Sequence, residues 1–541
     1  GINHGRWPVS KRRESVYLSL KNLPSQVFFV LEAGCRWGTD FFNIMGLNMY
    51  TAPFDSGRFC IGKFRPMESS NSVLVVDLDG TLVSTDALVE SGLDFLHQHP
   101  AGILRLPGWL RSGKAMLKQS LANNSSLCIE KLPYNDYVLE LIRQAKQSGK
   151  RVVLATASDQ AIARAVADHL GCFDEVIASD GGTNLSAARK RDALVQRFGV
   201  RGFDYIGNSS DDLLVWQASE HAILIDTPAR VARAARRTAN VSDEYSTQKT
   251  PLLAFLKALR PHQWAKNGLI FVPLMTAHAF SVDALGVALL AFVCFCLVAS
   301  GTYLINDLLD IQDDRQHPSK CKRPFAAATL DPLTGIWSAL LLVAVGVLLG
   351  VMLLPPLFVL SLIAYLVITL AYSLVLKSMM AVDVITLTVL YTLRIVAGSV
   401  AIETEPTFWI LTFSLFIFLS LALVKRFAEL QQARNKGETG KSAGRGYYPS
   451  DMEMVAAMGV GNGYLSILFF ALYIQDAATI VLYSHPQWLW LICPVLMYWV
   501  TRLWLLTHRG EMHDDPVVFA IKDKVSLVTL LMIMAVFGAA I

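Results

Sequence analysis

The hydrophobic pattern divides the chain into a front part with short apolar runs and a back part with long ones. Short runs such as Val73-Leu74-Val75-Val76 alternate with helical stretches up to about residue 240. Buried parallel strands have this composition, and their alternation with helices predicts a doubly wound parallel α/β sheet. From about residue 266 the apolar runs are near the ~20 residues that a membrane-spanning helix needs. We therefore predict an α/β domain over 71–240, a linker with an interfacial helix over 241–265, and an all-α polytopic membrane domain over 266–541.

Residues 1–70 show neither a helical nor a strand period, and they lack the layout of a signal peptide. Met67 stands just before a short polar segment, after which the first strand begins. We expect translation to start near Met67, and the preceding residues to be upstream sequence or poorly ordered. A peptide from upstream of Met67 in the natural protein would contradict this.

The back part contains nine expected spans, and the first of them is short. Lys and Arg are absent from the connections 278–283, 352–356, 402–406 and 484–487, and they are concentrated in the alternate connections. By the positive-inside rule, the basic connections and the α/β domain share the cytoplasmic side, in a bacterial inner membrane. The expected spans are centred near residues 274, 295, 342, 363, 391, 416, 472, 496 and 533.

Composition agrees with a membrane protein, since 53% of the 541 residues are hydrophobic and only 17% are charged. The net charge of +4 is too small to indicate nucleic acid as a partner. The eight cysteines show neither metal-binding spacing nor a disulfide framework, which indicates a reducing compartment together with a membrane.

An acidic stretch follows the second expected span without a break. Asp307, Asp310 and Asp314 are spaced i, i+3 and i+7, so they share one face if the helix continues. Carboxylates this close favour a divalent cation, and Mg²⁺ prefers one or two carboxylates together with phosphate oxygens. The alternative is a solvated loop that ends a helix, but acids at a membrane edge are costly and are functional by default. Flanking polar and basic residues are candidates for substrate binding: Asn306, Arg315, Lys320, Lys322 and Arg323.

Further charged residues lie inside or beside the later spans. Asp383 and Arg394 are about three helical turns apart and would share a face. Arg394 stands within a span and would need a buried anion. For each of the others, the alternative is an interfacial charge that reaches the membrane surface. These candidates for substrate binding are Lys266, Lys377, Asp383, Arg394, Lys425, Arg426 and Glu429.

Four motifs of the α/β domain follow its predicted strands. Two aspartates with one residue between them follow the first strand, at the end where α/β sheets place their ligands. The four motifs, in this order, resemble the haloacid-dehalogenase-like phosphatase superfamily. They are Asp77-Leu78-Asp79-Gly80-Thr81, Thr156-Ala157-Ser158, Lys190, and Gly207-Asn208-Ser209-Ser210-Asp211-Asp212.

That resemblance implies a phosphatase with Asp77 as the nucleophile and Asp79 as the general acid and base. Thr156 and Lys190 would bind the phosphoryl group, and Asp77, Asn208 and Asp212 would hold Mg²⁺. The family usually has aspartate where this chain has Asn208, and the neutral oxygen weakens metal binding. Roughly 75 residues separate the first two motifs, enough for a helical cap that usually restricts such enzymes to small substrates. The alternative is a phosphatase fold that has lost its activity and serves as a scaffold.

The motif Asn306-Asp307-x-x-Asp310-x-x-x-Asp314 resembles the UbiA-type prenyltransferase superfamily. Members usually carry a second aspartate-rich motif after the sixth span, where this chain has Lys425-Arg426 and only Glu429. That departure favours the branch whose donor, phosphoribosyl pyrophosphate, has an extra phosphate that needs cations. Four segments carry the likeness to this branch, which acts on decaprenyl phosphate: 263–267, 314–320, 372–383 and 425–430.

This second resemblance implies an Mg²⁺-dependent transferase that moves phosphoribose from a phosphorylated sugar donor to a polyprenyl phosphate in the membrane. Asp307, Asp310 and Asp314 would bind the metal, and the fused phosphatase would then remove a phosphate from the product. One alternative is an aromatic prenyltransferase that uses a polyprenyl diphosphate donor. A transporter or scaffold built on the same bundle is the other. The prenyl chain length and the oligomeric state stay open.

Overall fold

The computed structural model describes residues 73–180, 182–247, 251–317, 319–437, 439–440, 445–512 and 515–541. The expectations for residues 1–70 lie outside the described residues. All described residues belong to one unit of the chain, Cys60–Ile541.

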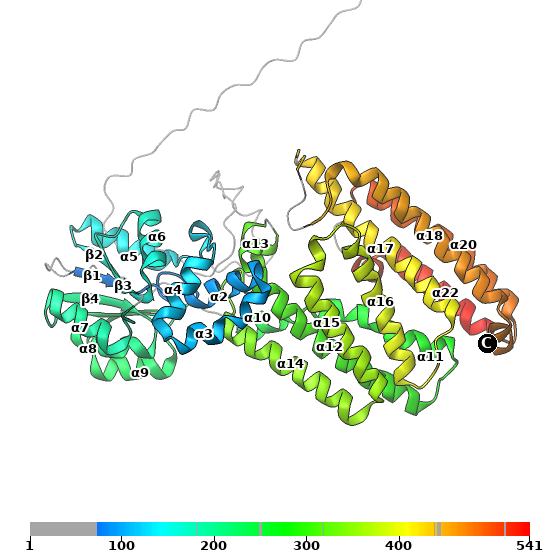
Figure 1. Cartoon of the computed structure of the whole chain (residues 1–541), viewed down its shortest axis with the longest axis horizontal. Coiled ribbons are helices and arrows are strands. Elements are labelled where there is room, and N and C mark those ends of the chain that lie inside the picture. The colour runs from blue at the N-terminus through cyan, green and yellow to red at the C-terminus, as the bar shows by residue number, and fades with distance from the viewer. Residues whose placement is uncertain are drawn as a thin grey trace, which may run out of the picture. The chain divides into compact units, whose positions relative to one another are not determined.

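Six parallel strands form one sheet in the order β3-β2-β1-β4-β5-β6 (Figure 1). The central strand β1 (Val73–Val76) pairs with β2 (Val152–Asp159) on one side and with β4 (Phe203–Gly207) on the other. Side chains on both faces of these strands are buried in two apolar clusters, which explains their short β-branched runs. The predicted doubly wound sheet is confirmed. The other strands and the helices around the sheet are β3 (Glu175–Ser179), β5 (Ala222–Ile225), β6 (Val241–Tyr245), α5 (Asp136–Gln147), α6 (Gln160–Leu170), α7 (Ala187–Phe198), α8 (Leu213–Ala218) and α9 (Ala229–Thr238).

The sheet extends past residue 240, because β6 is its sixth strand and pairs in parallel with β5. Tyr245 on β6 stacks against Tyr137 on α5, with ring centroids 4.1 Å apart. The Tyr137 hydroxyl also donates a hydrogen bond to Asp243 Oδ2, at 2.5 Å. The polar segment that the sequence assigned to the linker therefore begins as an edge strand.

A helical insertion follows β1, as expected for a cap. Lys118 in this insertion donates from Nζ to the carbonyl oxygen of Ala157, which belongs to the second motif. The cap therefore contacts the carboxyl end of the sheet. Its elements are α2 (Ala87–Gln98), η1 (Pro100–Leu104), α3 (Leu106–Arg111) and α4 (Lys114–Asn124).

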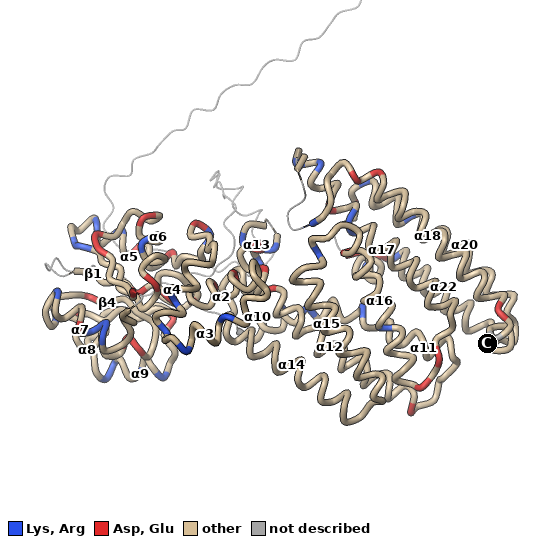
Figure 2. The backbone as a smooth tube through the Cα atoms, viewed as in Figure 1, with Lys and Arg blue, Asp and Glu red and all other residues tan. Residues whose placement is uncertain are grey.

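Seven helices in the described part of the chain are long and apolar enough to cross a membrane. Figure 2 shows few charged residues along α12, α14 and α15. These seven helices make the chain an integral membrane protein. Their bounds are α12 (Val282–Leu309), α14 (Pro332–Leu353), α15 (Pro356–Leu374), α16 (Val382–Ala401), α17 (Phe408–Asn435), α18 with the preceding η7 (Pro449–Gln475), and α20 with the preceding η8 (Pro486–His508).

Two of the nine expected spans, near 274 and 533, are not among these seven helices, because their α-helices are shorter than 18 residues. The first consists of η4 (Pro261–Phe271) followed directly by α11 (Val272–Thr276). A 3₁₀ helix rises about 2.0 Å per residue instead of 1.5 Å, so together they extend about 30 Å, the thickness of a hydrocarbon core. The last is α22 (Lys524–Ala540), with 17 residues, which follows α21 (Pro516–Lys522).

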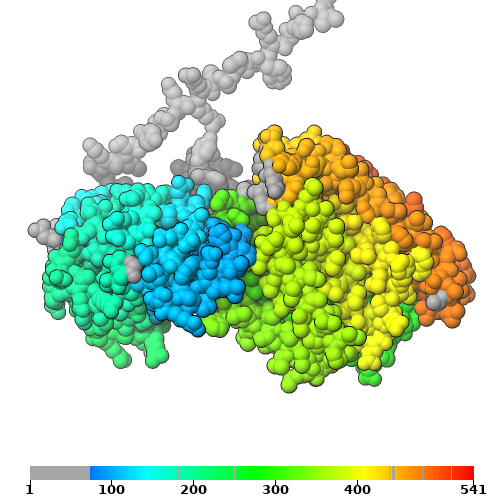
Figure 3. All heavy atoms as spheres, viewed as in Figure 1, coloured from blue at the N-terminus to red at the C-terminus, as the bar shows by residue number. Residues whose placement is uncertain are grey.

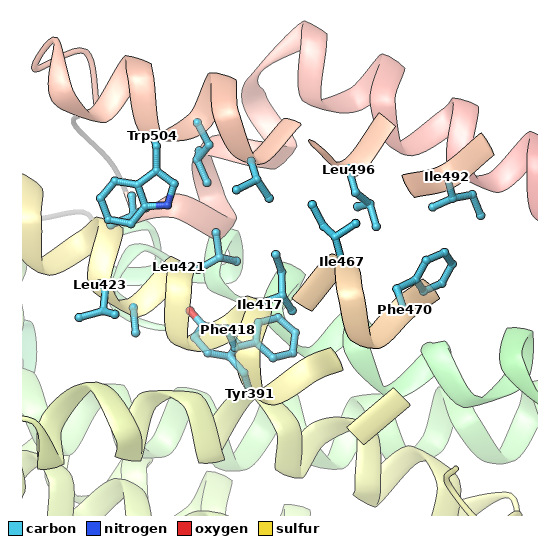
Figure 4. Close-up of a cluster of buried hydrophobic side chains, with 14 of the residues drawn as sticks. Tyr391, Ile417, Phe418, Leu421, Leu423, Ile467, Phe470, Ile492, Leu496 and Trp504 are labelled. Atoms are coloured by element: carbon cyan, nitrogen blue, oxygen red, sulfur yellow. The ribbon is translucent and has the colours of Figure 1, made fainter. Parts of the chain in front are cut away.

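Large apolar side chains fill the space between α16, α17, α18 and α20 (Figure 4). Phe418 on α17 stacks on Tyr391 of α16, with ring centroids 5.0 Å apart. Trp504 on α20 packs against Phe427 and donates from Nε1 to Ser420 Oγ, at 3.1 Å. The space-filling view shows the yellow-green and yellow part of the chain, which contains α14 to α17, as a closely packed surface on this face (Figure 3). The basic and acidic side chains described below are held by these packed helices.

Gly398 marks a close approach between α16 and η4, because a Cβ at this position would lie 2.2 Å from the carbonyl oxygen of Ile270. Replacing Gly398 with alanine is expected to displace η4 and to destabilise the membrane domain by about 1–3 kcal/mol. The measurement is the thermal unfolding midpoint of the purified chain in detergent. Gly461→Ala on α18 is the matched control, since a Cβ there meets nothing within 4 Å. An equal midpoint for both variants would contradict the close approach.

Candidate active sites

The carboxyl end of the sheet brings three of the predicted phosphatase residues together. Lys190 on α7 donates from Nζ to Asp77 Oδ1 at 2.8 Å and to Asp212 Oδ1 at 3.4 Å. It also donates to the Tyr205 hydroxyl at 2.9 Å, and that hydroxyl donates to Asp212 Oδ1 at 2.7 Å. Asp77 follows β1 and Asp212 follows β4, so neighbouring parallel strands deliver both carboxylates to one edge.

Asp79 lies beside the second motif. Its Oδ2 accepts a hydrogen bond from Ser158 Oγ at 2.5 Å, and the Thr156 hydroxyl is 3.5 Å away. Its Oδ1 accepts from the backbone N–H of Ala87, the first residue of α2, at 2.8 Å. Ser158 was not among the predicted site residues, although it stands two positions after Thr156.

Burial and charged neighbours shift the pKa values of these carboxyl groups in different directions. It raises the pKa of Asp79 to about 6, against the hydrogen bond from Ser158. It also raises the pKa of Asp77 to about 7, while Lys190 opposes this. Burial acts in the same direction on Asp212, but Lys190 and Tyr205 together hold the pKa of Asp212 below its usual value. A carboxyl group with a pKa near 6, as for Asp79, suits proton transfer near neutral pH.

The residues expected to hold Mg²⁺ in the phosphatase site fit a cation. Asn208 Oδ1 is buried and has no hydrogen-bond partner among the described residues. Asp212 Oδ2 accepts from the N–H groups of Asn208 and Ser209, at 3.1 and 3.0 Å. Gly80, at φ +72°, makes room for Asn208, since a Cβ there would lie 2.0 Å from Asn208 Nδ2. An unpartnered amide oxygen beside two buried carboxylates is a donor set of the kind that Mg²⁺ takes.

The acidic motif of the membrane domain is not one continuous helix. Asp310 ends α12 and begins α13 (Ile311–Gln316), so Asp314 lies on a separate helix from Asp307. Asp307 and Asp314 nevertheless converge on one atom, Arg323 Nη1, at 3.2 and 2.6 Å. Arg260 Nη2 also contacts Asp307 Oδ1, at 2.5 Å. Asp307 on α12 and Asp314 on α13 thus hold one cationic atom between them. The same pair of carboxylates fits a bound Mg²⁺.

Asp310 faces a different set of groups. Its carboxylate accepts from Lys377 Nζ at 2.8 Å and from Asn306 Nδ2 at 3.0 Å, and His97 Nε2 is 3.8 Å away. Asp310 and His97 form a group with Asp313, in which the ligand atoms lie within 4.8 Å of one another. Within the described ranges, no such group contains Asp307, Asp310 and Asp314 together. The interruption at Asp310 gives the three aspartates different partners: Asp307 and Asp314 contact Arg323, and Asp310 contacts Lys377.

The predicted phosphate-binding cations differ in their surroundings. Arg315 is fully engaged, because it donates to both carboxylate oxygens of Glu90 and to the carbonyl oxygen of Ala326. Lys320 and Lys322 are exposed, and the charges of Asp314 and Asp310 act on Lys320. Arg260, which is not one of the predicted site residues, contacts Asp307 directly although it lies 47 residues earlier in the chain.

A second group of charges lies deeper among the helices. Lys266 Nζ donates to Asp515 Oδ2 at 2.8 Å, and Lys425 Nζ lies 3.7 Å from the same oxygen. Burial acts to raise the pKa of Asp515, but Lys266 and Lys425 outweigh it and lower that pKa to about 2. Asp515 belongs to the charged loop 513–516, for which the sequence leaves a functional and an interfacial role open, and it joins two of the predicted binding residues.

Asp383 and Arg426 form an ion pair of 2.7 Å in which both side chains are almost completely buried. Tyr447 donates its hydroxyl to Asp383 Oδ1 at 2.8 Å, and Arg426 also contacts Glu429. Removing either charge of such a pair would leave the other buried and unpaired.

Arg394 is buried, and its hydrogen bonds go to neutral groups. It donates from Nε to Asn267 Oδ1 at 2.9 Å and from Nη2 to the Tyr365 hydroxyl at 3.1 Å. Its guanidinium carbon lies 4.8 Å from the Tyr365 ring centroid and 5.6 Å from that of Tyr391. The buried anion expected from the sequence is therefore replaced by amide and aromatic partners within the described part of the chain.

The fold and these sites define a two-part membrane enzyme, with an aspartate-based phosphatase domain ahead of a helical transferase domain. Residues 74–215 match the haloacid dehalogenase-like hydrolase family, and residues 269–533 match the UbiA prenyltransferase family. The chain belongs to the UbiA prenyltransferase family and carries a haloacid dehalogenase-like domain at its front.

Three curated proteins are similar to this chain. The uncharacterized protein y4nM of Sinorhizobium fredii is 38% identical over 84% of this chain and 88% of its own length. The nodulation protein NoeC of Azorhizobium caulinodans is 38% identical over 52% of this chain and 92% of its own length. Decaprenyl-phosphate phosphoribosyltransferase of Mycobacterium tuberculosis is 28% identical over 53% of this chain and 93% of its own length.

Proposed function

We propose that the membrane domain transfers phosphoribose from phosphoribosyl pyrophosphate to a polyprenyl phosphate, with Mg²⁺ held at the acidic motif. The charge around that motif carries the proposal. Arg260, Arg323 and Lys377 contact the three aspartates, and Lys320 stands beside them. Asp313 adds a fourth carboxylate beside Asp310, so four cations balance four carboxylates, and a bound divalent cation would leave two surplus positive charges. Such a site suits a donor with a pyrophosphate and a further phosphate.

The residues of the chain have separate roles in this proposal. Asp307 and Asp314 would hold the Mg²⁺, which, when bound, neutralises negative charge on the pyrophosphate. Arg260, Arg323 and Lys377 bind phosphate oxygens and orient the donor. A phosphate oxygen of the lipid forms a bond to C1 of the ribose as the bond from C1 to pyrophosphate breaks. The name of the mycobacterial relative supports a polyprenyl phosphate as the acceptor.

The front domain would hydrolyse a phosphomonoester, and the fusion suggests the 5-phosphate of the transferase product. Asp77 attacks the phosphorus, Asp79 protonates the leaving oxygen, and Asp79 then takes a proton from the water that cleaves the aspartyl-phosphate. Lys190 and Thr156 bind the phosphoryl oxygens. The distribution of Lys and Arg supports a cytoplasmic location for both sites, in a bacterial inner membrane.

The test uses purified full-length protein in detergent with Mg²⁺, a polyprenyl phosphate and radiolabelled phosphoribosyl pyrophosphate. Label is expected to enter the organic phase only when both substrates and Mg²⁺ are present. A parallel reaction supplies a polyprenyl diphosphate and an aromatic acid. Prenylation of the aromatic acid without transfer of phosphoribose would move the protein to the aromatic prenyltransferases. Inactivity with both donors would favour a transporter or scaffold.

A further inference from the structure

One face of α2, a helix of the phosphatase domain, is buried against the acidic motif of the transferase domain. Val89, Leu93 and His97 lie along this face at helical spacing, together with Glu90. Leu93 is buried in an apolar cluster with side chains of α12 and α13, among them Leu308 and Ile311. The contact therefore has an apolar part that favours burial as well as a charged part.

Glu90 provides the charged part of this contact, and its side chain is completely buried. Arg315 on α13 donates to Glu90 Oε1 at 2.6 Å and to Oε2 at 2.7 Å, and Gln312 Nε2 donates to Oε2 at 3.1 Å. Such a two-pronged pair fixes orientation as well as distance. A buried carboxylate is tolerated when it is paired, so Glu90 favours the arrangement in which α13 lies against α2.

The same helices reach both active sites. Arg315 follows Asp314, whose carboxylate contacts Arg323 at 2.6 Å in the acidic motif. At its other end, α2 begins with Ala87, whose N–H holds the carboxylate of Asp79. The short helix α13 begins at the interruption at Asp310, and Arg315 holds it through Glu90 on α2 and through the carbonyl oxygen of Ala326.

We infer that Glu90 is a positioning residue of the transferase, which orients Asp314 and the rest of α13 through Arg315. This inference depends on the proposed role of Asp314 in metal and donor binding. It assigns the phosphatase domain a structural part in transfer that does not require phosphatase chemistry. It also assigns Arg315 to this contact instead of to direct phosphate binding.

The test compares four full-length proteins in detergent: Glu90→Gln, Arg315→Gln, the double variant, and Glu140→Gln as the matched control. Glu140 lies on α5 of the same domain and is exposed. The first readout is the concentration of Mg²⁺ for half-maximal transfer and the KM for whichever donor the unmodified chain uses. The second is hydrogen–deuterium exchange of residues 311–316 without metal or substrates. Hydrolysis of p-nitrophenyl phosphate reports on the phosphatase site.

Each single variant is expected to raise the Mg²⁺ requirement or the donor KM about tenfold, as changes to residues behind metal ligands commonly do. The double variant should be no worse than the singles, because the two side chains act through one contact. Exchange at 311–316 should become faster, and phosphatase turnover should stay within about twofold. Glu140→Gln should change none of these.

Glu90→Gln that folds and keeps the normal Mg²⁺ requirement, donor KM and exchange rates would overturn the inference. Effects that multiply to about a hundredfold in the double variant would do the same, because independent actions multiply. Exchange is read without substrates, so the docking contact is tested even if phosphoribosyl pyrophosphate proves not to be the donor. In that case the proposed donor is wrong, and the exchange rates of residues 311–316 still show whether Glu90 positions α13.

Discussion

Replacing Asp77 with asparagine is expected to lower phosphatase turnover by at least about 10⁴-fold, because loss of a covalent nucleophile removes most of the catalysis. Asparagine preserves the shape of the side chain and the proximity to Lys190, which is 2.8 Å from Asp77 Oδ1. The measurement is hydrolysis of p-nitrophenyl phosphate by the full-length protein in Mg²⁺.

The product of the transferase gives a second readout for the same variant. If the front domain removes the 5-phosphate, Asp77→Asn should accumulate a lipid-linked ribose that still carries it, as mass spectrometry of the organic phase would reveal. Asp211→Asn is the matched control, since Asp211 is an exposed neighbour of Asp212. If the lipid product carries the same amount of phosphate in the unmodified protein and in Asp77→Asn, the phosphatase acts on another substrate. Unchanged hydrolysis in Asp77→Asn would remove Asp77 from the role of nucleophile.

Replacing Asp310 with asparagine is expected to lower transfer into the organic phase by about 10³-fold, the scale seen when one preorganised electrostatic group is lost. Asp310 lies at the junction of α12 and α13 and contacts Lys377 and Asn306. Loss of the carboxylate removes the group that accepts from Lys377 and Asn306, so Lys377 is no longer oriented for the phosphates of the donor. The measurement is the initial rate over a range of Mg²⁺ concentrations.

Asp313→Asn serves as the matched control and also separates two possible cation positions. Asp313 is exposed, but it belongs with Asp310 and His97 to the group whose ligand atoms lie within 4.8 Å. If the cation lies between Asp307 and Asp314, Asp313→Asn should keep most of the transfer rate. A loss as large as that of Asp310→Asn would place the cation with His97 instead. Full activity of Asp310→Asn would exclude this motif from catalysis.

The sequence predicts which residues of the phosphatase motifs come together. Parallel strands end at one edge of a sheet, so a motif at the end of β1 and another at the end of β4 must lie near each other. Lys190 could be assigned because its motif stands in a fixed order with the others. Ser158 and Tyr205 carry no comparable signal, because a hydroxyl next to a motif or within a buried strand has many ordinary roles.

The transferase site was predicted less completely, and the interruption at Asp310 is the main reason. No glycine or proline stands between Asn306 and Gln316 to mark the end of α12. Spacing alone therefore placed Asp307, Asp310 and Asp314 on one face, whereas the structure divides them between Arg323 and Lys377. The span near 274 was similarly hard to judge, because the number of residues does not reveal the longer rise of a 3₁₀ helix.

The sequence by itself determined the two domain classes, the order of the phosphatase motifs and the acidic motif beside a membrane span. These features depend on local periodicity and on short spacings, which neighbouring residues encode directly. Only the tertiary structure decided which cation meets which carboxylate. Arg315 and Glu90 are 225 residues apart, and Lys266 and Asp515 are 249 apart. Such pairs depend on how whole helices pack, because an unpaired buried charge is costly wherever its partner lies in the chain.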